Sequence, residues 1–219
     1  MLPITINGHR THIPTRWEDF TIERMQAVVQ GQQDTRAWSD VRNRLAAYTG
    51  APVKVFEDIT TSADAIELVM GCLQFEETSV MDSVKADPGV IHFYDEEGRC
   101  TQTIRVPRDL GGLPSGCHVA FRERVTTPLS EGEELVNVMH YAIASMMQPL
   151  YTGRQFDMDA VESLSEVCLR CKFVEAMGVV GFFLRKRSDY QLSKANFSSR
   201  HTSQHGTSNT ATSSRSTAG

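Results

Sequence analysis

The stretch that decides the fold reads ITINGHRTHIPTRWEDFT, from Ile4 to Thr21. Its two isoleucines alternate with polar residues before Asn7-Gly8, and Asn-Gly supplies the positive φ angles that a type I′ hairpin turn needs. Pro14 has no N–H to donate to a strand ladder, so it should end the second strand. Thr21 can then cap a helix that begins at Ile22. The stretch therefore predicts a hairpin near residues 4–13 that leads directly into a helix.

Apolar residues recur at helical spacing in six stretches of the chain. Gly31 is expected to end the first helix, Gly50 with Pro52 the second, and Pro149 the fourth. The predicted helices cover residues 22–30, 35–49, 62–75, 130–149, 159–168 and 173–186, with one further turn at 53–56.

The middle of the chain has strand character instead. An apolar run at Val90–Tyr94, an acidic turn that ends at Gly98 and a Thr/Ile/Val run at Thr101–Val106 predict a second hairpin, near residues 90–106. The Gly- and Pro-rich segment Asp109–Gly116 is expected to be a loop. The predicted fold class is α+β: a predominantly helical body with two β-hairpins.

Composition divides the chain in two. Of the 219 residues 40% are hydrophobic, which is enough for a core, but residues 198–219 have only two alanines as apolar residues. Such a segment cannot bury enough surface to offset an ordering cost of about 1–2 kcal/mol per residue. We therefore expect a folded body over residues 1–187 and a flexible, disordered Ser/Thr-rich polar tail over residues 188–219.

Charge is unevenly distributed. From Arg185 onward six basic residues face one acidic residue, a balance of +5, so the net charge of −5 leaves −10 for the preceding body. An acidic body makes nucleic acid an unexpected partner. No apolar run approaches the roughly 20 residues that span a bilayer, and the start of the chain lacks the pattern of a secretion signal. We expect no membrane association.

The five cysteines show no disulfide framework, which fits a reducing compartment. Cys168 and Cys171 are the only closely paired cysteines, and no second pair completes a zinc site. A redox role would place the pair at a helix start after a strand, whereas here it lies in an apolar helical pattern. We interpret both as buried core thiols, with metal binding and redox chemistry as the alternatives.

Other polar groups do not form a recognisable catalytic motif. Ser115-Gly116 lacks the nucleophile elbow, and Gly111-Gly112 lacks the lysine of a phosphate loop. The remaining candidates are a histidine pair for metal, two acidic clusters for acid/base chemistry and three separate histidines: His9 with His12, Glu76-Glu77, residues 95–97, and His92, His118 and His140. We predict no catalytic, cofactor or metal site, and hence no enzyme.

Two tryptophans and several methionines are candidates for partner binding. Trp17 either anchors an interface or seals the first hairpin onto the first helix, and we expect it to be largely buried. Trp38 begins a helical stripe and should pack in the core. Several methionines lie in helical stripes: Met139, Met146, Met147 and Met177. Methionine adapts to irregular partner surfaces, although it also fills ordinary cores, and we expect binding to protein partners through apolar helical surface.

Five segments together resemble one protein family. They are IxING from Ile4, IPTxWEDFTIER from Ile13, YTGAP from Tyr48, RVPRDLG from Arg105 and GFFLR from Gly181. In this combination the chain resembles the tail assembly chaperones of tailed bacteriophages, over about residues 4–187. The resemblance implies a non-enzymatic morphogenesis protein that binds the long, largely helical tape-measure protein and tail-tube subunits in the host cytoplasm during assembly.

The alternative is a structural component of the virion: a neck, connector or internal protein whose polar tail orders on a neighbouring subunit. The sequence also leaves open whether the chain forms a homo-oligomer, and whether the tail is a flexible arm or the end of one of two frameshift products. A chaperone leaves the finished particle, whereas a connector stays in it.

Overall fold

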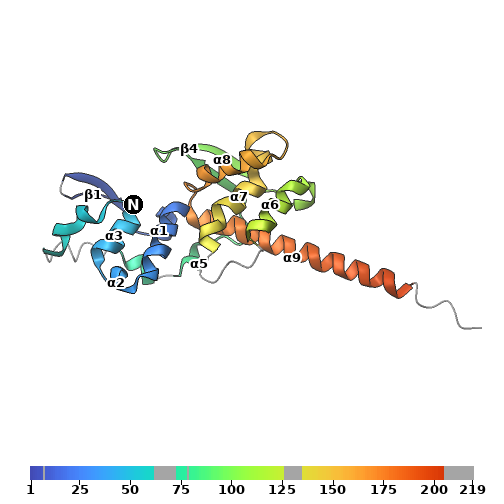
Figure 1. Cartoon of the computed structure of the whole chain (residues 1–219), viewed down its shortest axis with the longest axis horizontal. Coiled ribbons are helices and arrows are strands. Elements are labelled where there is room, and N and C mark those ends of the chain that lie inside the picture. Colours follow the sequence, from blue (N-terminus) through green and yellow to red (C-terminus); the bar gives the residue numbers. More distant parts are fainter. Residues whose placement is uncertain (7, 62–72, 78, 126–134, 205–219) are drawn as a thin grey trace, which may run out of the picture. The chain divides into compact units, whose positions relative to one another are not determined.

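The computed structural model describes residues 1–6, 8–61, 73–77, 79–125 and 135–204, with the side chains of 58–61, 77 and 189–204 left undescribed. Within these ranges it has eight α-helices and two separate two-stranded antiparallel sheets, which confirms the predicted α+β class (Figure 1). The chain divides into two compact units, Met1–Phe182 and Phe183–Gly219. No helix among the described residues is long and apolar enough to cross a membrane.

The first hairpin forms as predicted. Strand β1 (Leu2–Ile6) pairs with β2 (His9–Ile13), and Ile6 lies opposite His9, so two residues link the strands. Gly8 has a φ of 77°, the left-handed conformation that the Asn-Gly turn requires. After the 3₁₀ helix η1 (Trp17–Asp19), the Arg24 N–H donates to Thr21 Oγ1 at 3.3 Å. Thr21 therefore caps the next helix, α1 (Ile22–Gln33), as the sequence predicts.

The prediction that Gly31 ends α1 is wrong, because the helix continues to Gln33. A Cβ on Gly31 would lie 3.3 Å from the Trp38 ring, so the missing side chain makes room for an aromatic contact. The predicted helix 35–49 is also wrong as one piece. It is broken into α2 (Thr35–Trp38) and α3 (Val41–Thr49), because Asp40 caps α3 by accepting from the Arg42 N–H. Gly50, with a φ of 72°, ends α3 as expected.

The next segment is short and irregular. The predicted turn at residues 53–56 is the start of the 3₁₀ helix η2 (Val53–Thr61). The predicted helix 62–75 falls mostly outside the described residues, and its described end belongs to η3 (Leu73–Glu77). A one-turn helix, α5 (Val80–Ser83), follows and leads to the second hairpin.

The second hairpin is also confirmed. Strand β3 (Val90–Tyr94) pairs with β4 (Cys100–Arg105), and a register shift lies between Phe93 and Tyr94. Gly98 in the connecting turn has a φ of 75°. On β3 the side chains of Ile91 and Phe93 are fully buried, as the alternating pattern of a half-buried strand requires.

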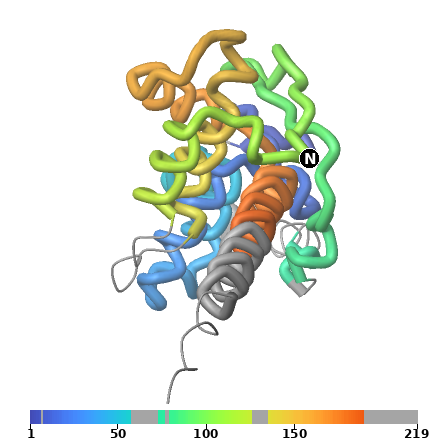
Figure 2. Tube along the Cα trace, turned by 90° about the vertical axis from the view of Figure 1, so that its right-hand side faces the viewer, coloured from blue at the N-terminus to red at the C-terminus, as the bar shows by residue number. Residues whose placement is uncertain are grey.

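The second half of the chain is a helical bundle. After η4 (Leu110–Gly112), helix α6 (Ser115–Val125) occupies a segment whose first two residues we assigned to a loop. It is followed by α7 (Leu135–Thr152), α8 (Met158–Cys168) and α9 (Phe173–Gln204). Helix α7 packs against both α6 and α8, and the three lie together again in the view of Figure 2.

Helix α7 is the centre of the core. Every residue from Tyr141 to Gln148 is buried. The prediction that Pro149 ends this helix is wrong. The helix instead continues to Thr152, and the N–H of Gly153, with a φ of 65°, donates to the Pro149 carbonyl at 2.9 Å. Burial of α7 outweighs the one hydrogen bond that Pro149 cannot donate, because tertiary packing provides most helix stability. The predicted start of this helix at Ser130 lies outside the described residues.

Backbone hydrogen bonds join the segment that leads into α1 to the segment that leads into α9. The Ile22 N–H donates to the Cys171 carbonyl at 3.1 Å, and the Phe173 N–H donates to the Phe20 carbonyl at 2.9 Å. Helix α9 then continues past residue 187, where the sequence predicts that the folded body ends. The side chains of 189–204 and all of 205–219 lie outside the described residues, so the flexible tail stays a prediction.

Candidate functional site

The two paired cysteines are core thiols, as predicted. Cys168 is the last residue of α8 and Cys171 lies in the turn before α9, and neither has any exposed surface. Burial raises the pKa of the Cys168 thiol well above its usual range, and its hydrogen bond with Cys171 adds to the effect. A protonated, enclosed thiol is a poor nucleophile. Among the described residues no group of three His, Cys, Asp or Glu side chains is placed to hold a metal ion.

The first pair of histidines also lacks a shared site. His9 and His12 are both exposed on β2. Side chains on a strand alternate between its faces, so two residues that are three positions apart point to opposite sides. This spacing argues against joint coordination of a metal by the pair.

The other three histidines have three unrelated partners. His92 Nδ1 on β3 lies 2.7 Å from Glu175 Oε1 on α9, and His118 Nε2 on α6 lies 2.9 Å from the Leu110 carbonyl oxygen. His140 Nδ1 on α7 lies 3.2 Å from the Gln26 side chain on α1. Each ring is therefore committed to a structural contact with a different element.

The acidic clusters have structural roles as well. Asp95 and Glu97 both bind the Arg99 side chain across the second hairpin turn, at 2.8 and 2.9 Å. The Arg99 N–H also donates to Asp95, and this hydrogen bond is the main reason that the pKa of Asp95 is lowered. Glu76 pairs with Arg44 on α3. Burial raises the pKa of Glu76, and Arg44 opposes that change.

The glycine and serine candidates have no catalytic arrangement. Gly111 and Gly112 lie in η4, where the Gly111 N–H donates to the Asp109 side chain at 2.8 Å. Ser115 and Gly116 form the first turn of α6.

The tryptophans form part of an aromatic cluster. Trp17 is mostly covered, in line with the prediction, and its ring contacts Phe75 and Phe20 at centroid distances of 4.9 and 5.7 Å. The Trp17 ring thus packs against the residue just before Thr21 and against η3, and its role in sealing the hairpin onto α1 stays a prediction. Trp38 is half-buried and meets Tyr48 edge-on at 5.6 Å.

The methionines of the helical stripes lie mostly in the core, the alternative that the sequence left open. Met139, Met146 and Met147 have at most 1% of their surface exposed, and Met177 is only partly exposed. The three on α7 belong to the core because this helix is covered by its neighbours over most of its length. Among the described residues of the bundle, the exposed large apolar side chains are Val119 on α6, Leu150 near the end of α7 and Met158 at the start of α8.

Helix α6 packs against α7, and one contact at each end of α6 joins it to the residues around the start of α8 and to α7. At one end, a Cβ on Gly116 would lie 2.3 Å from the Phe156 ring, so the ring rests directly on the α6 backbone. At the other end, the Arg124 guanidinium lies 4.7 Å above the Tyr141 ring, and the Tyr141 hydroxyl donates to Met158 Sδ at 3.3 Å.

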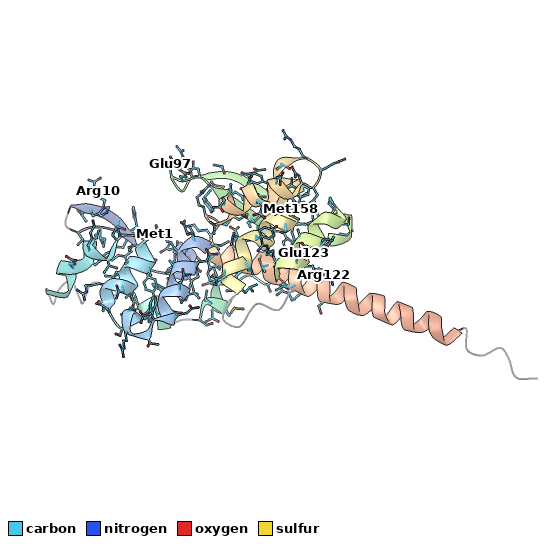
Figure 3. All side chains as sticks on the ribbon, in the orientation of Figure 1. Met1, Arg10, Glu97, Arg122, Glu123 and Met158 are labelled. Carbon is cyan, nitrogen blue, oxygen red and sulfur yellow. The ribbon has the colours of Figure 1, made fainter. Side chains whose placement is uncertain are left out.

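Val119 lies between these two contacts. Gly116, Val119 and Glu123 are spaced three or four residues apart and share one side of α6, whereas Arg124 is five residues from Val119 and lies toward the side of the buried Cys117, Ala120 and Phe121. Val119 is 51% exposed and Met158 is 39% exposed. Figure 3 labels Met158 at the start of α8 and Glu123 on α6, in the part of the bundle where these contacts lie. The α6–α8 surface, as we name it, consists of Val119, Arg124, Tyr141, Phe156 and Met158.

The polar atoms of the α6–α8 surface are held in place. Burial raises the pKa of Tyr141, Glu162 adds to this effect, and Arg124 opposes it. The hydroxyl therefore stays protonated and can donate to Met158. Tyr, Met, Phe and Arg are the residue types enriched in the buried centres of protein interfaces. The arrangement suits contact with another protein better than chemistry on a small molecule.

Sequence reasoning did not find the α6–α8 surface because it assigned Ser115 and Gly116 to a loop. One signal was present: Cys117, Ala120 and Phe121, all buried, have the i, i+3, i+4 spacing of a helix face. Comparisons with protein-family models, with curated proteins and with solved structures found no match to this chain.

Proposed function

We propose that the chain is a non-enzymatic phage morphogenesis protein that binds tail proteins, the tape measure or the tail tube, during assembly. The α6–α8 surface is the observation that carries this proposal, together with the resemblance of the sequence to tail assembly chaperones. Val119 and Met158 expose apolar side chains on the bundle, and Arg124 on the same helix as Val119 is held over the Tyr141 ring.

The surface fits a helical partner. An amphipathic helix binds by placing apolar residues at i, i+3 or i+4, and i+7 against such a surface. Because Arg124 is already positioned by Tyr141, a partner would lose less side-chain entropy in ordering it. A long, largely helical tape measure offers many such segments.

The roles of the titratable groups support a binding function over catalysis. His92, His118 and His140 each contact a different structural partner, Cys168 and Cys171 are enclosed, and the acids of residues 95–97 hold a turn. These groups are thus used in structural contacts within the described part of the chain. The proposal needs none of them.

The test measures affinity for purified tape-measure and tail-tube proteins of the phage that encodes the chain. Val119→Glu and Met158→Glu place a charge in the α6–α8 surface, and each should weaken binding about 10- to 30-fold, which corresponds to roughly 1.4–2 kcal/mol. Both side chains are exposed, so the melting temperature should stay within about 1–2 °C of the wild-type value.

The matched control is Val53→Glu, a change at a 42% exposed valine on η2. It should leave affinity unchanged. If neither phage protein binds the wild-type chain, the proposed function fails. If the control weakens binding as much as the two test variants, binding is real but the α6–α8 surface is not its site.

One observation favours the alternative of a virion structural component. Helix α9 passes from the first compact unit into the second and reaches Gln204, so the C-terminal unit begins with a helical arm. Mass spectrometry of purified particles separates the two functions. A chaperone should be absent, whereas a neck, connector or internal protein should be present in a fixed copy number.

A further inference from the structure

The amide of Gln26 on α1 has a defined orientation. Its nitrogen lies 3.1 Å from the Val136 carbonyl oxygen and 3.3 Å from the Asn137 carbonyl oxygen, in the first turn of α7. The opposite orientation would place the amide oxygen against two carbonyl oxygens. The Nε2 group of Gln26 therefore faces α7 as a hydrogen-bond donor.

This orientation determines the state of His140. Its Nδ1 atom lies 3.2 Å from the same Gln26 nitrogen, which can only donate. Nδ1 must then be the unprotonated acceptor of a neutral imidazole. A second proton on the ring would place an N–H of His140 against the N–H group of Gln26.

The other two bonded histidines differ in this respect. His118 Nε2 faces a carbonyl oxygen and His92 Nδ1 faces a carboxylate, and both partners are acceptors. Protonation leaves these two contacts intact or strengthens them. Of these three histidines, only His140 loses its contact when it gains a proton.

We propose that His140 and Gln26 form an acid-sensitive latch that holds α1 against the start of α7 and opens when the His140 ring is protonated. The latch joins the first helix of the chain to the central helix of the core. It does not depend on the proposed function.

The groups around His140 also favour the neutral ring, which agrees with a contact that is lost in acid. Burial lowers the pKa of His140, Arg124 from α6 lowers it further, and Glu166 and Glu162 from α8 oppose the change. The neighbour from α1 is the uncharged Gln26. Because the folded-state pKa lies below the unfolded value of about 6.5, the unfolded chain binds more protons near pH 6. Stability from this group is full above about pH 6.5 and decreases as the pH falls toward the folded-state pKa.

A histidine NMR titration of the full chain tests the contact. His140 should titrate below the ordinary histidine value of about 6.5. Gln26→Met keeps a similar volume and removes the donor, so it should shift the His140 midpoint to higher pH. If burial alone set the midpoint, the more apolar methionine would leave it unchanged or lower it. That result would overturn the latch.

Amide hydrogen exchange tests the opening itself. After correction for intrinsic rates, α1 should exchange faster at pH 5.5 than at pH 7.5 in the wild-type chain, while the buried part of α7 should not. His140→Gln keeps an acceptor for Gln26 at every pH and should abolish the difference, whereas His118→Gln should retain it. Acid-dependent exchange of α1 that persists in His140→Gln would refute the proposal, even if Gln26→Met failed to fold.

Discussion

At Gly178 on α9 another segment of the backbone lies very close to the helix. We predict that replacing this glycine with alanine destabilises the protein. A Cβ at this buried position would lie 2.7 Å from the carbonyl oxygen of Lys85, in the segment between α5 and β3. Carbon–oxygen contacts in proteins settle at about 3.3–3.6 Å, so the backbone would have to move by about 0.6 Å. The obstacle is backbone, which cannot turn aside as a side chain can.

The magnitude follows from two opposing effects. Alanine stabilises a helix interior by about 1 kcal/mol relative to glycine. Forcing an extra carbon into a packed site costs about 1–3 kcal/mol. We expect Gly178→Ala to lower the free energy of unfolding by up to about 2 kcal/mol, which corresponds to a fall in melting temperature of up to roughly 8 °C for a chain of this size.

Gly31→Ala is the matched control in α1. Its new Cβ would lie 3.3 Å from the Trp38 ring. This contact is tight, but it is made by the side chain of a half-buried residue and not by backbone. We expect the control to change the free energy of unfolding by between zero and a gain of about 1 kcal/mol. Urea unfolding of the two variants measures both values. Equal stability changes, or a stabilised Gly178→Ala, would refute the reasoning that the Lys85 backbone fills this space.

Two further predictions concern buried polar groups. Iodoacetamide at pH 8 should modify the exposed Cys100 in the native protein. It should modify Cys117, Cys168 and Cys171 only after unfolding, because all three thiols are buried. Burial also raises the pKa of Cys117 to about 11. Mass spectrometry with and without denaturant checks this, and rapid native labelling of Cys168 would contradict it. Asp19→Ala should cost about 1.5–3 kcal/mol at pH 7, because this buried carboxylate accepts from the Thr15 N–H at 3.0 Å and pairs with the Met1 amine. Burial raises the pKa of Asp19, but these hydrogen bonds lower it by more, so the carboxylate stabilises the fold above about pH 4 and the effect disappears as the pH falls through its folded-state pKa. An Asp19→Ala penalty that is the same at pH 7 and pH 3 would contradict this account.

Local chemistry was enough to predict both hairpins and several helix ends. Gly8, Gly50 and Gly98 adopt the positive φ angles that their turns and caps require, and Thr21 caps α1 through its own side chain. These features depend on residues only a few positions apart. Their physical causes are therefore visible in the sequence.

Three predictions failed because distant residues decided the outcome. Gly31 does not end α1, because Trp38 packs on it, and Pro149 does not end α7, because the surrounding bundle buries that helix. Helix α6 begins at Ser115-Gly116 because Phe156, forty residues away from Gly116, rests on its backbone. In each case the sequence shows a helix breaker, and packing overrides it.

The sequence by itself determined the α+β class, the two hairpins, the glycine turns and the burial of the cysteine pair, since each follows from backbone geometry or from hydrophobicity within one segment. Only the tertiary structure decided which apolar side chains stay exposed: it enclosed Met139 and Met146 and left Val119 and Met158 at the surface. The tertiary structure also set the state of His140, because Gln26 lies 114 positions away along the chain. A periodic pattern shows that a helix has an apolar face, but the partner of that face and the leftover surface depend on how the helices pack.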